Sequence, residues 1–267
     1  TGGEPLVRRG FAELVSETAH RFPGVELCLT TNAVLLDGYV DVLRDCGIRK
    51  VNVSLDSLDR RRYAAITGYD GLERVLKNLD RMIDPGHFDV KVNAVLLPET
   101  LEEIDSMLDY FSGRNVVLRF IERMPFGSSR SGERFVTSDE ITAQLARRGE
   151  LERTVFNDTT VAEMFTLHYR GSFHIKIGVI PSLSHKFCSR CNRLRLTCDG
   201  HLRTCLLSNV EYDIKTPYRM DMGDDAIRSV ILRAVSEKKR EHAVDCSREE
   251  EGCGAIMAGR GMQKIGG

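Results

Sequence analysis

The sequence predicts an α/β fold, in which a parallel sheet, either open or curled into a barrel, is followed by a β-rich C-terminal region. In the first half, strand-like runs alternate with helix-like segments at the spacing of consecutive βαβ units. Polar side chains gather at the ends of these strands, which is the edge where parallel α/β sheets bind ligands. After a Gly- and Ser-rich stretch at 124–135, the pattern changes to long β-rich segments.

The first half is expected to contain four helices and four strands. Apolar periodicity predicts helices at about 6–20, 36–46, 71–83 and 100–112. Runs of apolar and β-branched residues predict strands at 25–32, 50–56, 89–97 and 115–122. The polar residues at or near the strand ends are Thr30, Thr31, Asn32, Ser54, Asp56, Lys91, Asn93, Arg119 and Glu122.

The second half is expected to contain two hairpins and a helix. Segments 161–169 and 172–181 lie head to tail around Arg170 and Gly171, which predicts the first hairpin. A second hairpin is expected over 194–206, where Asp199 and Gly200 supply the turn residues. Helical periodicity returns at about 223–238, and a Gly-rich segment ends the chain.

The composition is that of an ordinary globular protein. Its 267 residues include 38 Lys and Arg against 39 Asp and Glu, so the net charge gives no general affinity for nucleic acid or an anionic membrane. The sequence shows neither an apolar run long enough to span a bilayer nor a secretory leader. These features predict a cytoplasmic protein without nucleic-acid or membrane partners.

Cys188, Cys191 and Cys205 form a C-x2-C-x13-C array, which predicts a metal centre. Three protein ligands leave one metal position free for water or substrate, whereas a structural zinc site closes with four. Four arginines are interleaved with the array: Arg190, Arg193, Arg195 and Arg203. Because a guanidinium is always charged and its planar fork matches phosphate oxygens, these residues predict an anionic substrate.

The spacing alone fits a zinc site and a three-thiolate iron-sulfur cluster equally well. A zinc site would need a fourth ligand, for which Cys198, His185 and His201 are candidates. Strand alternation places Cys198 on the same side as Leu194 and Leu196, so this thiol is expected to face the apolar side.

Three weaker signals admit structural explanations. Gly2 and Gly3 precede a helix and would let the backbone approach a ligand, but a simple turn with Pro5 at the first helical position also explains them. Lys91 lies in an apolar strand, where a long side chain often reaches out to water. The glycines at 266–267 would ordinarily be a frayed terminus.

Six segments carry a resemblance when they are taken together and in order: TGGEPL, VNVSLDSLD, VKVNAVLL, RFIERMPFG, FCSRCNRLRLTCDGHLRTCL and the final GG. They resemble the molybdenum cofactor biosynthesis protein A family, the GTP 3′,8-cyclases of the radical S-adenosylmethionine (SAM) superfamily. The resemblance implies a partial parallel β/α barrel over 1–122, with its first strands missing. Over 123–267 it implies a molybdenum cofactor synthesis region with a cluster-binding hairpin and a Gly-Gly tail.

The resemblance also implies a role for individual residues. The positions that match SAM contacts are Gly2, Gly3, Glu4, Ser54 and Met124. The positions that match GTP contacts, chiefly to the phosphates, are Thr30, Lys91, Arg119, Arg193, Leu194 and Arg195. The ligands of a [4Fe-4S] cluster whose free iron binds guanine are matched by Cys188, Cys191 and Cys205. A mobile catalytic tail is matched by Gly266 and Gly267.

The implied reaction is radical cyclisation. A 5′-deoxyadenosyl radical made from SAM abstracts hydrogen from the ribose C3′ of GTP, and the C3′ radical attacks C8 of guanine. The product is (8S)-3′,8-cyclo-7,8-dihydroguanosine 5′-triphosphate. The resemblance further implies a homodimer, an external electron donor and pyranopterin monophosphate synthase as the downstream enzyme.

The family's first cluster is held by a C-x3-C-x2-C motif upstream of TGGEP, and this motif does not occur in the 267 residues. A second [4Fe-4S] cluster is therefore expected only in a missing N-terminal part, so that this chain, truncated at its N-terminus, would be inactive by itself. The alternatives are a non-catalytic relative that binds GTP or zinc, and a zinc hairpin that uses the same arginines on nucleic acid.

Overall fold

The computed structural model describes residues 2–83, 86–125, 134–154 and 161–241. The chain forms two compact units, of which the larger comprises 4–123 and 135–181 and the smaller comprises 1–3, 124–134 and 182–267. Segment 135–181 therefore groups with the first half of the chain. The family regions expected over 1–122 and 123–267 follow a different division and stay a prediction.

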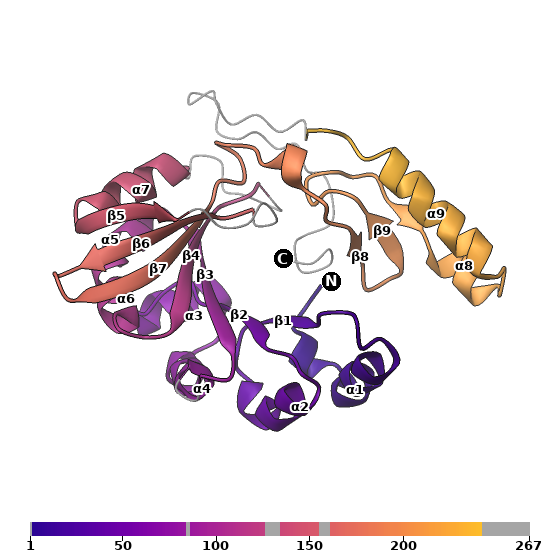
Figure 1. Ribbon diagram of the computed structural model, residues 1–267, viewed down its shortest axis with the longest axis horizontal. Helices are drawn as coiled ribbons and strands as arrows, with labels where there is room; N and C mark the ends of the chain where they lie inside the picture. The colour runs from indigo at the N-terminus through magenta and orange to yellow at the C-terminus, as the bar shows by residue number, and fades with distance from the viewer. Residues whose placement is uncertain (1, 84–85, 126–133, 155–160, 242–267) are drawn as a thin grey trace. The chain divides into compact units, whose positions relative to one another are not determined.

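The larger unit is built on a seven-stranded sheet with the order β1-β2-β3-β4-β7-β6-β5 (Figure 1). The strands are β1 (Cys28–Thr31), β2 (Lys50–Ser54), β3 (Asp89–Leu96), β4 (Val116–Glu122), β5 (Gly149–Thr154), β6 (Glu163–Tyr169) and β7 (Phe173–Ile180). Strands β1 to β4 and β7 are parallel, whereas β6 runs antiparallel to β5 and β7. The expected parallel α/β sheet is confirmed.

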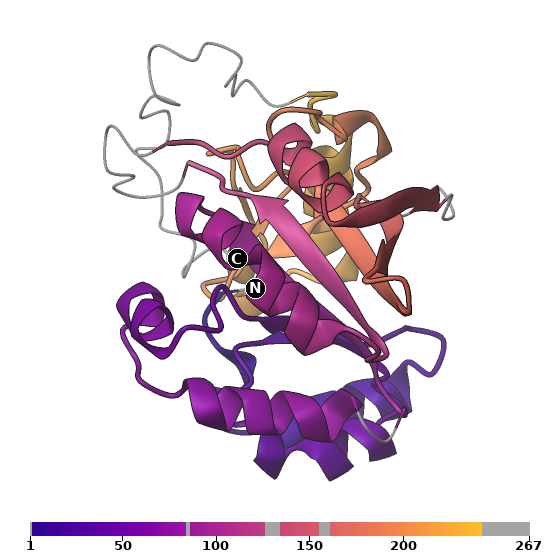
Figure 2. The same ribbon diagram turned by 90° about the vertical axis from the view of Figure 1, so that its left-hand side faces the viewer.

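Helices cover one face of this sheet, and Figure 2 shows them in front of the strands. The α-helices are α1 (Phe11–Arg21), α2 (Val40–Asp45), α3 (Arg60–Thr67), α4 (Leu72–Ile83), α5 (Pro98–Glu102), α6 (Ile104–Phe111) and α7 (Ser138–Ala146). Two 3-10 turns, η1 (Pro5–Val7) and η2 (Leu36–Gly38), precede α1 and α2. Each expected helix of the first half is therefore present. Two of them are split into a turn and a shorter helix, and the one expected at 100–112 is divided between α5 and α6.

Alternation along the strands separates an apolar face from a polar face. Val51, Val92 and Leu118 point to the helix side and are 0% exposed, as are Leu79 and Met82 of α4. Burial of a Val, Leu or Met side chain stabilises the fold by about 1.5–3 kcal/mol. The residues between them along β2, β3 and β4 are only half-buried, which leaves the opposite face of the sheet open to a ligand.

Helices α3 and α7 and strand β5 were not expected from the sequence. Helix α3 buries only Tyr63, so its apolar periodicity is weak. Local hydrogen bonding defines it instead, because the Asp59 carboxylate accepts from the backbone N–H of Arg62 and Gly68 ends the helix at φ 70°. The Thr137 side chain caps α7 in the same way.

The first expected hairpin is confirmed by the antiparallel pairing of β6 with β7. Its two turn residues, Arg170 and Gly171, have φ angles of 48° and 70°. Positive φ at both positions is typical of the tight turns whose twist matches a two-stranded ribbon.

The smaller unit contains η3 (Cys188–Arg190), the strands β8 (Arg195–Leu196), β9 (His201–Arg203) and β10 (Tyr212–Asp213), and the helices α8 (Lys215–Arg219) and α9 (Asp224–Ser236). The hairpin expected around Asp199 and Gly200 is confirmed, since β8 pairs antiparallel with β9 and Gly200 has a φ of 88°. A small core of Leu202, Tyr212 and Ala234 fixes α9 against this hairpin.

Candidate functional site

Polar side chains lie in register on the open face of the larger unit's sheet. Thr30 pairs with Asn52, and Asn52 pairs with Lys91, so the three side chains cross β1, β2 and β3 in one row. Residues in register share a face, and so do residues two apart along a strand. This polar sheet face therefore comprises Thr30, Asn52, Ser54, Lys91, Asn93 and Arg119.

Asn52 connects the two outer members of the polar sheet face. Its Nδ2 donates to Thr30 Oγ1 over 3.1 Å, and its Oδ1 accepts a hydrogen bond from the Arg119 guanidinium. One neutral amide thus links β1 to β4. The structure brings together three residues that the sequence predicts for GTP, namely Thr30, Lys91 and Arg119.

The electrostatics of the polar sheet face favour an anion. Burial lowers the pKa of the Lys91 ammonium, and the nearby positive charges of Arg119 and Lys50 lower it further. Among the described residues, the Lys91 ammonium forms no hydrogen bond or ion pair. The repulsion between Lys91 and Arg119 would be reduced by a bound anion such as a phosphate.

Asn52 was not named by sequence reasoning, and Asn93 was named only among the polar strand-end residues, without a role toward SAM or GTP. Asn52 stands two residues before Ser54, and Asn93 stands two residues after Lys91, so the period of two could have indicated both. The Oδ1 of Asn93 is buried without a hydrogen-bond partner in the described part of the chain. A bound ligand would satisfy such an oxygen.

The three cysteines of the array line one cavity in the smaller unit. Its volume is about 60 Å³, and its walls include Cys188, Cys191 and Cys205 together with Met124 and Phe187. Burial raises the pKa of the Cys205 thiol, and the neighbouring Cys188 and Cys191 raise it further. Buried thiols of this kind become ligands only when a metal takes the place of their protons.

The three thiols can be compared with the ligand sets of a zinc ion and of an iron-sulfur cluster. Within the described residues, no three His, Cys, Asp or Glu side chains converge closely enough to ligate one ion. A cluster takes each thiolate at a different iron, so its ligands need not converge on one point. The three candidate fourth ligands for zinc, Cys198, His185 and His201, are not among the residues that line the cavity.

The faces of the β8 segment are opposite to those expected from the sequence. Leu194 and Leu196 are 40% and 50% exposed, and Cys198 is exposed with them, whereas Thr197 is 3% exposed. The alternation itself is confirmed. The expectation that Cys198 faces an apolar interior is wrong, because Cys198 and Leu196 are exposed even though Leu202, the register partner of Leu196, is buried in the small core.

The arginines of the array divide into two groups. Arg193 and Arg195 line the cysteine cavity, and burial together with the charge of Arg193 lowers the pKa of Arg195. Arg203 is only 2% exposed and pairs with Glu211 over 3.0 Å, so its charge is neutralised inside the fold. The fourth arginine of the array, Arg190, is exposed and does not line the cavity. An anion at the cavity would therefore meet Arg193 and Arg195.

A lysine from beyond α9 also reaches the cysteine segment. The Lys238 ammonium lies 3.7 Å from Cys191 Sγ and donates to the Arg193 carbonyl oxygen over 2.9 Å. This contact fixes the backbone between the second cysteine and the first cavity arginine.

The residues predicted for SAM occupy several local environments. Gly2 and Gly3 have φ angles of 112° and 69°, a conformation that favours glycine. The Glu4 carboxylate accepts from Thr31 Oγ1 over 2.6 Å and from the backbone N–H groups of Leu6 and Asn32. A carboxylate has about four acceptor sites, so one remains for an ammonium group.

The remaining site residues predicted from the sequence are two further SAM positions and the two C-terminal glycines. Ser54 lies exposed on the polar sheet face, at the end of β2. Met124 lies in the wall of the cysteine cavity. Gly266 and Gly267 lie outside the described residues.

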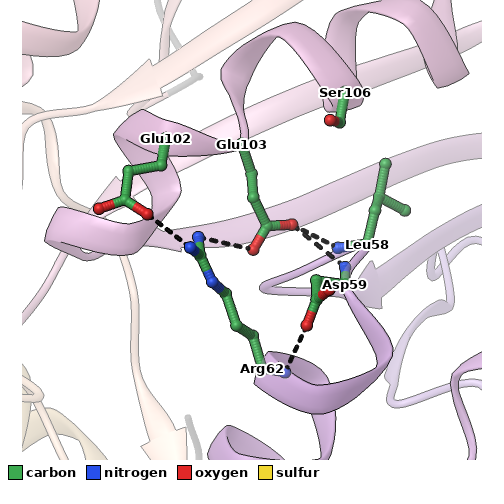
Figure 3. A pocket seen from close by; sticks show the side chains of 6 residues that line it. All are labelled: Leu58, Asp59, Arg62, Glu102, Glu103 and Ser106. Carbon is green, nitrogen blue, oxygen red and sulfur yellow. Dashed lines mark hydrogen bonds and ion pairs between the residues drawn. The ribbon is translucent and has the colours of Figure 1, made fainter.

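A second cavity, of about 320 Å³, lies between α5, α6 and the segment after β2 (Figure 3). Its buried carboxylate, Glu103, accepts from Ser57 Oγ over 2.7 Å and from the backbone N–H groups of Leu58 and Asp59. Figure 3 also shows Arg62 directed to Glu103. Because the Glu103 oxygens are occupied by the fold itself, this carboxylate anchors a loop.

Replacing Glu103 by alanine is expected to lower the free energy of unfolding by about 2–4 kcal/mol, because several buried donors lose their acceptor. Urea denaturation measures this loss. Glu102→Ala is the matched control, since Glu102 pairs with the same Arg62 but is 65% exposed, and its loss should stay below about 1 kcal/mol. Equal losses for the two variants would show that Glu103 is no anchor.

Two family models match the chain. The Radical SAM superfamily model matches residues 1–111, and the Molybdenum Cofactor Synthesis C model matches residues 116–244. Together they cover both the polar sheet face and the cysteine cavity. In the described part of the chain, no helix is both long enough and apolar enough to cross a membrane.

The similar proteins given below are all described as GTP 3′,8-cyclases. The chain is 35% identical to "GTP 3′,8-cyclase" of Rhodococcus opacus, over 100% of the chain and 74% of the relative. It is 38% identical to "GTP 3′,8-cyclase 2" of Mycobacterium tuberculosis, over 100% and 74%, and 38% identical to "GTP 3′,8-cyclase" of Rhodopirellula baltica, over 92% and 69%.

A solved structure shares the fold. Streptococcus suis SuiB, in a crystal structure with bound S-adenosylmethionine, superposes with a TM-score of 0.57 at 14% sequence identity. The match covers 86% of this chain and 55% of SuiB.

Proposed function

Because this chain belongs to the GTP 3′,8-cyclase family of radical SAM proteins, we propose that it acts in molybdenum cofactor biosynthesis by cyclising GTP with SAM as co-substrate. The product would be (8S)-3′,8-cyclo-7,8-dihydroguanosine 5′-triphosphate. One observation carries the proposal: 35% identity to a GTP 3′,8-cyclase extends over 100% of the chain.

The cations of each unit would bind the substrate's charge. Lys91 and Arg119 share the polar sheet face, and a triphosphate would offset their mutual repulsion. Thr30 adds a hydroxyl in the same row. Arg193 and Arg195, with Leu194 between them, would supply further GTP contacts beside the cysteine cavity. Each set of contacts would orient the part of the nucleotide that it binds.

Cys188, Cys191 and Cys205 would hold a [4Fe-4S] cluster, and the count of three thiolates would leave one iron for the guanine base. When bound, the family's clusters and SAM supply the one-electron chemistry that starts the reaction. The residues that we propose for SAM are Gly2, Gly3, Glu4, Ser54 and Met124. Gly266 and Gly267 would act as a catalytic tail.

Several further parts of the proposal rest on the family alone. They are a second [4Fe-4S] cluster, an external electron donor, pyranopterin monophosphate synthase as the downstream enzyme, a homodimer and a cytoplasmic setting. We also propose two family regions, 1–122 and 123–267.

Anaerobic turnover tests the proposed function. The protein made from its complete coding sequence, incubated with GTP, SAM and a reductant, is expected to convert GTP to the 3′,8-cyclic nucleotide and release 5′-deoxyadenosine. Liquid chromatography with mass spectrometry measures both products. SAM cleavage that leaves GTP intact would contradict the substrate, and colourless protein with stoichiometric zinc would favour the non-catalytic relative.

A further inference from the structure

One residue of the polar sheet face, Asn52, makes hydrogen bonds in two directions at once. Its amide nitrogen donates to Thr30 Oγ1 over 3.1 Å, and its amide oxygen accepts from the Arg119 guanidinium. Thr30 lies on β1 and Arg119 lies on β4, and strands β2 and β3 lie between them in the sheet. Asn52 therefore connects the Thr30 and Arg119 side chains directly.

The chemistry of an amide suits this position. An amide can donate and accept simultaneously, whereas a carboxylate only accepts and an ammonium only donates. An aspartate at position 52 would hold the guanidinium more strongly but would also neutralise the charge that Arg119 offers to an anion. A neutral amide at position 52 contacts the Arg119 guanidinium without placing a negative charge beside it.

A second feature lies on the other side of Arg119. Gly178 of β7 is the register partner of Arg119, and it is the only glycine in the strand Phe173–Ile180. A Cβ atom at position 178 would stand 2.7 Å from Cγ and 3.2 Å from Cδ of Arg119. The first distance is shorter than real Cβ contacts, so any side chain at 178 would displace the stem of Arg119.

The glycine has no conformational reason to be there. Gly178 is not among the residues with positive φ, so its backbone is accessible to every amino acid. A glycine inside a strand weakens that strand and often marks a close approach by another group. At position 178 the Arg119 side chain approaches most closely, and Met164 Sδ would stand 3.3 Å from the same Cβ atom.

We propose that Asn52 and Gly178 are positioning residues for GTP binding, Asn52 by orienting Arg119 and Thr30 and Gly178 by leaving the space in which the Arg119 stem lies. This inference rests on the proposed assignment of Thr30 and Arg119 to GTP. Neither residue needs to touch the nucleotide. Both act through the direction in which the guanidinium points.

The test measures the affinity of the reconstituted chain for GTP and for guanosine by isothermal titration calorimetry. Asn52→Leu and Gly178→Ala are each expected to weaken GTP binding by about 10-fold, the effect of losing one well-oriented charged hydrogen bond. Guanosine affinity should stay unchanged, because the displaced guanidinium faces phosphate. A general structural defect would weaken both ligands.

An Arg119→Ala chain tests whether Gly178 acts through Arg119. If Gly178 only makes room for Arg119, adding Gly178→Ala to an Arg119→Ala chain should cause no further loss of GTP affinity. This double variant should also fold even if Gly178→Ala alone does not. Matched controls are Asn115→Leu, an exposed asparagine at the start of β4, and Gly24→Ala, where a Cβ meets open space. Both controls should bind GTP as the unchanged chain does.

The outcomes separate the inference from the proposed function. If Arg119→Ala weakens GTP binding but Asn52→Leu and Gly178→Ala do not, the positioning roles are overturned and the assignment of Arg119 stands. If the losses are equal for GTP and guanosine, the positioning roles are likewise overturned. If Arg119→Ala leaves GTP affinity unchanged, the assignment of Arg119 falls and the inference falls with it.

Discussion

Cys205→Ser is expected to abolish the cluster of the smaller unit, so that iron attributable to it falls from about four atoms per chain to nearly none. The variant leaves two thiolates in a cavity that, among the described residues, has no other cysteine, and a serine hydroxyl remains protonated where a thiolate would ligate iron. Guanine would then lose its iron partner, so GTP binding should weaken as well. Iron and sulfide analysis after anaerobic reconstitution measures the first effect, and calorimetry measures the second.

Cys198→Ser is the matched control for this experiment. Cys198 is exposed and does not line the cavity, although it lies within the same C-x13-C interval. Its replacement should leave iron content and GTP affinity unchanged. Loss of iron from Cys198→Ser, with full occupancy in Cys205→Ser, would reverse the ligand assignment.

Arg195→Ala is expected to weaken GTP binding by about 10-fold to 100-fold while iron content stays the same. Hydrogen bonds between charged groups contribute about 1.5–3 kcal/mol, which corresponds to this range. The strong end of the range is expected because Arg195 is half-buried beside the cavity and its charge is poorly screened. Titration of GTP into the reconstituted chain measures the change.

The nearby Arg190 gives the comparison for Arg195. It belongs to the same arginine-rich segment, but its side chain is exposed and lies outside the cavity wall. Arg190→Ala should therefore bind GTP almost normally. Equal weakening in both variants would mean that the segment attracts GTP by its total charge, without a specific contact.

The parallel sheet could be predicted because its signal is local and repeated. Buried strands such as β3 read as apolar runs with polar residues every second position, and the neighbouring helices show a clear apolar stripe. Helix α3 gave no such signal, since it buries only Tyr63 and is defined by capping. Its existence depends on hydrogen bonds that apolar periodicity does not detect.

The residues of the site were predictable to different degrees. The cysteine spacing indicated a metal centre, and the cavity then separated Arg193 and Arg195 from Arg203, whose pairing with Glu211 depends on tertiary structure. Gly178 could not have been selected, because its role depends on Arg119, a residue 59 positions earlier that becomes its neighbour only through the sheet register. A contact between residues so far apart in the sequence leaves no local sequence signal.

The most direct test of the account is whether the cluster held by Cys188, Cys191 and Cys205 binds the guanine base of GTP. Electron-nuclear double resonance of the reduced, reconstituted chain, with GTP carrying nitrogen-15 in guanine, measures this contact. We expect a nitrogen-15 coupling to the cluster that disappears in Cys205→Ser and persists in Cys198→Ser. A reconstituted chain that binds GTP tightly but shows no coupling, or that holds zinc in place of iron, would contradict it.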